Sequence, residues 1–188
     1  AAGYNLLGWG DVGRARFFSN TPIQRPADFK KLTPWQRLDD SIFGEFLKVA
    51  GAKSRKLGVN EVLTGLQTGQ IDAFPSSALA AVSLQWYNHI KYVTKQSDAI
   101  LIGATIIKKD KLDALPADLQ KVLTDSAARA HAVLTSSVRK ADDKAYKALI
   151  SRDIKEVDVS KYRSEWEGAA KKVRDSLAGK LYLRELLA

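Results

Sequence analysis

The sequence lacks cysteine altogether, and it has little histidine and no long apolar run. The absence of Cys from 188 residues excludes disulfide bonds, thiolate metal sites and a cysteine nucleophile. No apolar run approaches the roughly 20 residues that a membrane-spanning helix needs. His89 and His131 are far apart, and no zinc-protease, serine-hydrolase or phosphate-loop motif accompanies them. We therefore expect no catalytic residue, no metal site, no cofactor and no enzyme activity.

The start of the chain also lacks the parts of a secretion signal. The sequence begins Ala-Ala-Gly-Tyr, with neither an initiator methionine nor a basic region followed by a long apolar segment. We therefore expect the chain to be a processed or truncated product.

The net charge of +9, from 30 Lys and Arg against 21 Asp and Glu, raises one alternative function. A basic helical interaction module could bind nucleic acid or an acidic protein partner through such an excess. The excess is spread along the whole chain, however, with acidic residues interleaved. Spread charge is typical of a solvated surface, so we expect no nucleic acid partner.

Residues 59–92 give the clearest local pattern. Apolar residues at helical spacing end at Gly69, a short strand is expected at Ile71–Phe74, a second helix follows from Ser77 to about Tyr87, and a strand is expected at Ile90–Val93. The alternation of strand and helix predicts an α/β fold with a mostly parallel sheet. Ligands of such sheets bind beyond the carboxyl ends of the strands, which places a candidate binding edge at Asp72–Ser77.

The segments LQTGQIDAFPSS and LQWYNHIKYVT resemble the core of the solute-binding proteins of TRAP (tripartite ATP-independent periplasmic) transporters, the DctP-like family. Residues 21–30 and 112–123 are similar to further family segments. The resemblance implies a type II periplasmic-binding-protein-like α/β fold, with a mixed sheet flanked by helices and long C-terminal helices. It also implies a periplasmic receptor that captures a small organic solute in a hinged cleft and delivers it to membrane subunits.

The resemblance also implies a domain organisation. Residues 1–20 match a hinge or crossover segment, residues 21–97 an α/β ligand-binding lobe, residues 98–107 a crossover strand, and residues 108–188 a helical region packing across the lobes. The chain resembles about the C-terminal two-thirds of a family member, and thus an incomplete two-lobe receptor. The residues of these core segments are similar to those of the family branch that works with a tetratricopeptide-repeat partner.

One position departs from the family pattern. Aligning the segment that begins at Asp28 with the family motif puts Trp35 where the family has an arginine that pairs with the substrate carboxylate. Arg37 lies two residues further on, and on a strand it would share the face of Trp35 and reach an anion. The alternative is that Arg37 merely pairs with Asp39 or Asp40.

A second departure concerns the family's ligand-binding asparagine, which corresponds here to Ser76. Both changes predict a pocket lined by aromatic rings and a partly apolar ligand, rather than a small dicarboxylate. The predicted ring set is Trp35, Phe74, Trp86 and Tyr87. The alternative for Trp86 and Tyr87 is an ordinary core, and at most one of these neighbours is expected to face the cleft.

The glycine-rich segment around Trp9 is the last candidate. Its sequence GWGDVG has the spacing of a dinucleotide fingerprint, but neither the preceding strand nor the following helix is convincing. The family resemblance implies instead a stretch bordering the cleft, with Trp9 as a ligand-binding residue, whereas a core position for Trp9 is the alternative.

Helices are expected at four other places. Asp39, Asp40 and Ser41 precede an amphipathic segment that ends at Gly51, so the two carboxylates are interpreted as a helix cap rather than an acid–base pair. Residues 116–150 predict one continuous helix about 50 Å long, at ~1.5 Å per residue. Residues 159–177 predict another, and residues 182–187 a short terminal one.

Overall fold

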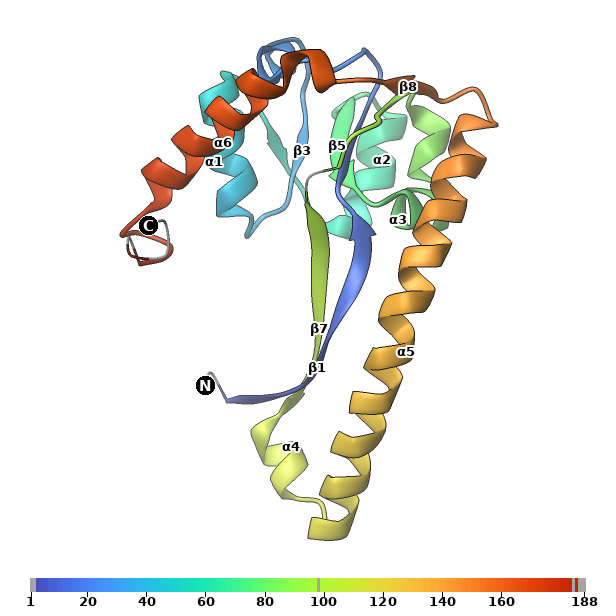
Figure 1. Cartoon of the computed structure of the whole chain (residues 1–188), viewed down its shortest axis with the longest axis vertical. Helices are drawn as coiled ribbons and strands as arrows, with labels where there is room; N and C mark the ends of the chain where they lie inside the picture. The colour runs from blue at the N-terminus through green and yellow to red at the C-terminus, as the bar shows by residue number, and fades with distance from the viewer. Residues whose placement is uncertain (1–2, 98, 184, 186–188) are drawn as a thin grey trace.

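A two-stranded ribbon and one long helix extend from an α/β lobe (Figure 1). The computed structural model describes residues 3–97, 99–183 and 185. The strands are β1 Tyr4–Arg14, β2 Arg16–Ser19, β3 Trp35–Gln36, β4 Arg55–Lys56, β5 Ala73–Ser76, β6 Tyr92–Thr94, β7 Ile100–Lys108 and β8 Lys155–Val157. The α-helices are α1 Ser41–Ala50, α2 Val62–Gln67, α3 Ala78–Ser83, α4 Lys109–Asp113, α5 Ala117–Ile150 and α6 Arg163–Leu177. The 3-10 helices are η1 Pro26–Lys31, η2 Val59–Glu61, η3 Trp86–His89 and η4 Ser160–Tyr162.

The central sheet of the lobe has the order β5-β2-β6-β8. One strand departs from the expected parallel direction: β2 pairs antiparallel with both β5 and β6, which therefore run parallel to each other. The chain passes from β5 through α3 to β6, but β5 and β6 are not neighbours in the sheet. β2, from a distant part of the sequence, lies between them. β8 on β6 and the short β3–β4 pair are parallel. A bridge from Pro34 to Ala73 places β3 next to β5.

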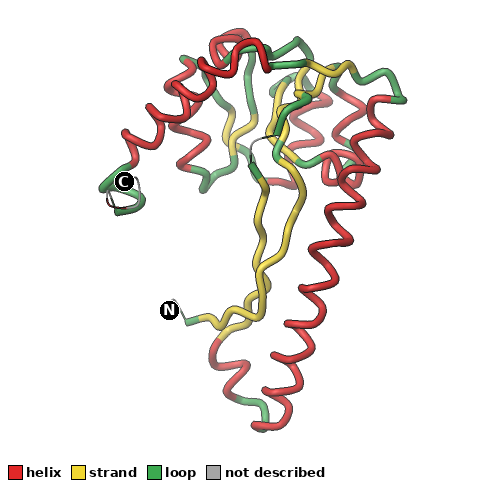
Figure 2. The backbone as a smooth tube through the Cα atoms, viewed as in Figure 1, coloured by secondary structure: helices red, strands yellow, loops and turns green. Residues whose placement is uncertain are grey.

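The ribbon consists of β1 and β7, which pair antiparallel from Tyr4↔Lys108 to Arg14↔Ile100 with two register shifts. It leaves the lobe and ends at α4, and α5 runs beside it back to the lobe (Figures 1 and 2). The predicted continuous helix over residues 116–150 is confirmed by α5, which has 34 residues. Large apolar side chains of the ribbon are exposed to solvent: Tyr4, Leu6, Trp9, Val12, Ile100, Ile102 and Ile106.

A group of aromatic rings holds α6 against α1. Phe17, Phe29 and Phe46 pack around Trp166 and Phe43 packs against these three, with ring centroids of neighbours 5.0–6.4 Å apart. The indole Nε1 of Trp166 donates a hydrogen bond to the carbonyl of Gln24 at 2.9 Å. The helix predicted over residues 159–177 is thus observed as η4 and α6, and it packs on the lobe.

Helix ends follow the local signals in the sequence. Asp40 caps α1 by accepting a hydrogen bond from the backbone N–H of Phe43 at 2.8 Å, so its interpretation as a cap is confirmed. Gly51 ends the helix at φ +72°. The helix expected to continue to Tyr87 is shorter, because Gln85 has φ +59° and separates α3 from η3. The helix predicted at 182–187 lies mostly outside the described residues.

Gln85 gives the first testable prediction. A non-glycine residue at positive φ is strained by roughly 1 kcal/mol, because Cβ crowds the following carbonyl. We expect Gln85→Gly to raise the free energy of unfolding by up to about 0.5 kcal/mol, since the entropy of the unfolded glycine offsets part of the gain. Urea unfolding measures the change. Exposed Gln67, the last residue of α2, is the control, because Gln67→Gly should destabilise by up to about 1 kcal/mol.

Candidate functional site

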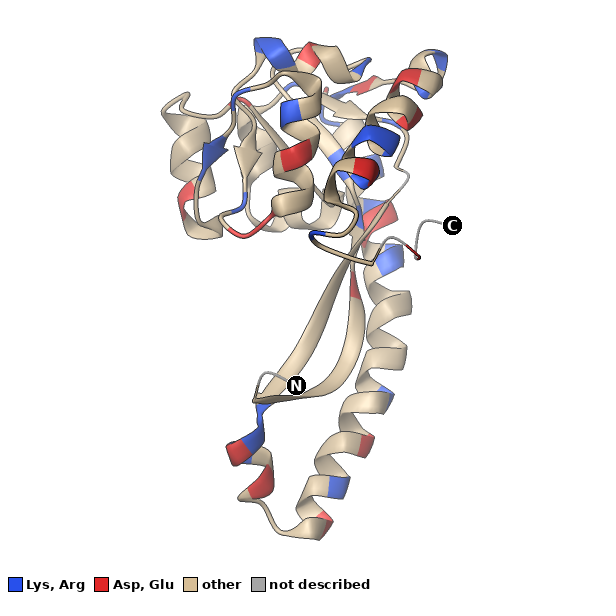
Figure 3. Ribbon diagram, turned by 90° about the vertical axis from the view of Figure 1, so that its left-hand side faces the viewer, with Lys and Arg blue, Asp and Glu red and all other residues tan. Residues whose placement is uncertain are grey.

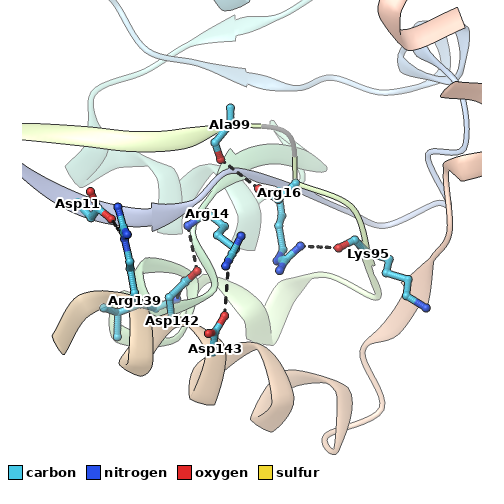
Figure 4. A network of polar contacts seen from close by, with 10 residues as sticks. Asp11, Arg14, Arg16, Lys95, Ala99, Arg139, Asp142 and Asp143 are labelled. Atoms are coloured by element: carbon cyan, nitrogen blue, oxygen red, sulfur yellow. Dashed lines mark hydrogen bonds and ion pairs between the residues drawn. The ribbon is translucent and has the colours of Figure 1, made fainter. Parts of the chain in front are cut away.

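The junction where β1 enters the lobe gathers charged side chains from several elements (Figure 4). Two ion pairs link it to α5: Asp11 pairs with Arg139, and Arg14 pairs with Asp143 at 3.6 Å. Because α5 contributes one residue to each of these ion pairs, the pairs hold the helix alongside β1.

Arg16 in β2 lies at this junction without an acidic partner. It is only 8% exposed, and among the described residues its guanidinium makes one hydrogen bond, from Nη1 to the carbonyl of Lys95 at 2.5 Å. Its Nε is buried with no hydrogen-bond partner in the described part of the chain. Burying a charge is costly unless an opposite charge compensates it. Arg16 is therefore an anion-binding candidate by its burial and by its incomplete hydrogen bonding.

Arg16 is absent from the residues predicted from the sequence. The available signal was its position at the start of the strand Arg16–Ser19, where the following residues are apolar. In the antiparallel register Arg16 pairs with Ser76 of β5, the serine that the resemblance placed at a ligand-binding position. Ser76 is itself buried. The register thus brings one predicted residue next to the missed arginine.

Asp142 of α5 holds the junction together. Its carboxylate accepts hydrogen bonds from two backbone N–H groups, Arg14 in β1 and Leu79 in α3, both at 2.9 Å. The side chain is 1% exposed. One buried carboxylate therefore joins the ribbon, the lobe and the long helix.

Three of the predicted ligand-binding rings lie in the hydrophobic core. Trp35, Phe74 and Trp86 are 4%, 1% and 3% exposed. Trp86 packs edge-on against the other two, with centroids 5.3 Å from Trp35 and 5.2 Å from Phe74. The indole of Trp35 donates to the carbonyl of Leu57 at 2.9 Å. In this conformation the three rings face one another rather than the solvent.

The other predicted residues are dispersed. Arg37 lies beyond β3, not on it, so the argument from a shared strand face with Trp35 is wrong. Its exposed guanidinium pairs with Asp39 at 3.0 Å, which is the alternative considered from the sequence. Tyr87 is half-buried, and its hydroxyl accepts a hydrogen bond from Arg152 at 2.6 Å. Trp9 is 64% exposed on the ribbon, so the core alternative for it is wrong.

Two hollows lie on the surface, and between them they contain one of the seven predicted residues. The first, of about 490 Å³, lies between α1, the β3–β4 pair and the end of α6, and its wall mixes polar and apolar side chains. Residues of this wall include Gln36, Asp40, Glu45, Lys56, Ser176 and Lys180. The second, of about 330 Å³, lies between the ribbon and α5 and is lined by Trp9, Gly10, Asp11, Ile102 and Thr135.

Charge and composition of the surface give no sign of a different site. Lys and Arg alternate with Asp and Glu over the lobe and α5, while most of the ribbon is uncharged (Figure 3). Among the described residues, no three His, Asp or Glu side chains group as metal ligands would. Within the same residues, no helix combines the length and apolar character of a membrane span.

Residues 1–180 match the family of bacterial extracellular solute-binding proteins, family 7, also called DctP. The chain belongs to this family. It is 25% identical over 184 residues to the C4-dicarboxylate-binding periplasmic protein DctP of Rhodobacter capsulatus, covering 96% of this chain and 55% of that protein. It is 31% identical over 123 residues to the 2,3-diketo-L-gulonate-binding periplasmic protein YiaO of Escherichia coli, covering 65% of this chain and 36% of that protein. The family 7 chain thus spans about half the length of these relatives, or less.

Solved structures confirm the predicted fold class. A TRAP periplasmic solute-binding protein from Shewanella oneidensis with bound succinate superposes with a TM-score of 0.88 at 22% identity, covering 94% of this chain and 58% of that one. One from Sulfitobacter with bound β-D-galacturonate gives 0.86 at 17% identity, covering 95% and 59%. The fold is therefore that of a TRAP solute-binding protein, of which this chain matches a part.

Proposed function

We propose that this family 7 chain is the ligand-binding part of a periplasmic receptor for a TRAP transporter, and that Arg16 holds a carboxylate of the solute. Arg16 carries this proposal, because it is a buried cation with free donor capacity and no acidic partner among the described residues. The relatives named above bind carboxylic acids, which such a cation fits. Family membership favours a receptor over an enzyme or a basic interaction module.

The predicted ligand-binding set remains part of this proposal in a revised form. Trp9 and Tyr87 reach the surface, and Ser76 is next to Arg16 in the sheet register. The core rings of Trp35, Phe74 and Trp86 would act by shaping the lobe beneath the ligand. Aromatic bulk in place of a second arginine favours a partly apolar monocarboxylate over a dicarboxylate.

The ligand would be captured by hinge closure. The ribbon joins the lobe through single stretches of chain near Arg14 and Ile100, and a ligand that makes better contacts in a closed state would favour that state. The proposed partners are the membrane subunits of the transporter. The similarity of residues 66–86 to one branch of the family supports a tetratricopeptide-repeat protein as a further partner, which co-purification with that protein would test.

Replacing Arg16 tests the binding proposal. We expect the wild-type chain to be stabilised by one of several acids (succinate, D-glucuronate or pyroglutamate) but not by neutral D-glucose. At 100 times the dissociation constant, binding contributes about 2.7 kcal/mol, or roughly 5–10 °C in the melting temperature. Arg16→Gln should weaken binding about 30-fold, because it removes the charge-assisted hydrogen bonds.

Arg14→Gln is the matched control for this experiment. Arg14 lies two residues away, is half exposed and already pairs with Asp143. We expect it to leave affinity within threefold of wild type. The proposal fails if none of the acids shifts the melting temperature, or if Arg16→Gln binds as tightly as Arg14→Gln.

We further propose that the chain is the C-terminal portion of a longer receptor. Two observations support this: it spans 55–59% of DctP and of the two solved relatives, and its ribbon exposes a row of apolar side chains. Such a surface is usually covered by another part of the protein. The intact mass of the protein from its native source should exceed the 20.7 kDa of this chain. An equal mass would contradict the proposal.

A further inference from the structure

Arg16 is held by the aromatic ring of Tyr146 and by the backbone carbonyl of Lys95. Its guanidinium carbon lies 4.0 Å above the ring centroid of Tyr146, which comes from α5. The hydroxyl of Tyr146 donates to Glu156 of β8 at 2.5 Å, and Glu156 also pairs with the ammonium of Lys95 at 3.3 Å. The carbonyl of Lys95 accepts the hydrogen bond of Arg16, which closes a ring of contacts.

The chemistry of these contacts orients the guanidinium without neutralising it. An aromatic face attracts the cation and fixes the plane of the group, yet it occupies none of the in-plane N–H donors. A carboxylate in place of the ring would pair with Arg16 and compete with any incoming anion. The carboxylate of Glu156 is instead bonded to the phenol and to Lys95.

The hydroxyl of Tyr146 stays protonated and donates a hydrogen bond to Glu156. Burial, together with the hydrogen bond to Glu156, raises the pKa of Tyr146 above its ordinary value. The neutral hydroxyl therefore keeps donating to Glu156, and the ring stays in place under Arg16.

We propose that Tyr146 is the positioning residue for Arg16, holding its free donors ready for a ligand carboxylate and making α5 part of the binding site. This inference rests on the proposed role of Arg16. An arginine side chain loses much rotamer freedom when it binds, and a ring that restrains it beforehand reduces that loss. Since α5 also flanks the ribbon, the helix links the anion site to the segment proposed to bend.

A ligand-free measurement tests the positioning directly. The Nε–H signal of Arg16 in a ¹⁵N–¹H NMR spectrum should be shifted upfield by the ring of Tyr146 and should exchange slowly with water. Tyr146→Phe should retain both properties, whereas Tyr146→Leu should lose them. Tyr162→Leu is the control, because the ring of Tyr162 lies 4.1 Å from Arg25 and not under Arg16. An unchanged Arg16 signal in Tyr146→Leu would overturn the inference.

Titrations with succinate, D-glucuronate and pyroglutamate supply the second readout. For whichever acid binds the wild type, Tyr146→Leu should weaken binding roughly tenfold, and Tyr146→Phe should stay within about threefold of wild type. Glu156→Gln should resemble Tyr146→Phe, because the ring remains. Equal affinities for wild type and Tyr146→Leu would refute the positioning role. If none of the three acids binds the wild type, the proposed function fails, while the Arg16 signal still decides whether Tyr146 orders the guanidinium.

Discussion

Replacing Asp142 by alanine is expected to lower the free energy of unfolding by about 3 kcal/mol. The carboxylate accepts the backbone N–H groups of Arg14 and Leu79, and it is almost entirely shielded from water. Alanine leaves both donors buried without a partner, and each unsatisfied donor costs about 1–3 kcal/mol. For a chain of this length, the melting temperature should fall by roughly 6–12 °C.

The adjacent Asp143 is the matched control for Asp142. Its side chain is 57% exposed and pairs with Arg14 at 3.6 Å. Exposed ion pairs contribute about 0–1 kcal/mol, so Asp143→Ala should change stability by less than about 0.5 kcal/mol. Calorimetric melting of Asp142→Ala and Asp143→Ala measures the two losses of stability. Similar losses from both would mean that Asp142 does not join the ribbon to the lobe as the geometry indicates.

Most features set by neighbours in the sequence were predicted correctly, although the helix expected to reach Tyr87 ends at Ser83. The α5 pattern repeats over many turns, and the caps of α1 depend on Asp40 and Gly51 a few residues from the helix. Gly69, predicted to end a helix, has φ +71°. In each case the stabilising contacts lie within a few residues, so the amino acid order is sufficient evidence.

Features set by distant pairing were not predicted. The position of β2 between β5 and β6 depends on partners more than fifty residues away. The burial of Arg16 follows from that pairing and from Tyr146 on α5, neither of which a local pattern contains. The presence of aromatic residues also did not show whether they lie in the hydrophobic core or in the ligand cleft. Trp35, Phe74 and Trp86 fit one another as well as they would fit a ligand.

Gly13→Ala should be the most destabilising single-methyl change near the junction, at about 4 kcal/mol. Gly13 has φ +114°, which costs a side chain roughly 1–2 kcal/mol. An added Cβ would also lie 2.6 Å from Cβ of Ser77 and 2.8 Å from the carboxyl carbon of Asp142. Inserting a methyl into so tight a space costs about 1–3 kcal/mol more.

Gly69→Ala separates the two contributions. Gly69 also has positive φ, at +71°, but nothing lies within 4 Å of its added Cβ. We expect a loss of about 1 kcal/mol, from backbone strain alone. Urea unfolding with a constant m-value measures both variants. Equal losses at the two glycines would show that the close approach of α5 to β1 is absent in solution.

Combining Gly13→Ala with Asp142→Ala links the two predictions. The Asp142→Ala change removes the carboxyl atoms that the new methyl group at position 13 would meet, while Ser77 still opposes it. The loss in the double variant should therefore be smaller than the sum of the single losses, by about 0.5 kcal/mol or more. Strict additivity would mean that the two residues do not touch, and that the ribbon meets α5 and the lobe by some other arrangement. Non-additivity would show that β1 and α5 meet at this junction, beside the segment at which hinge closure is proposed.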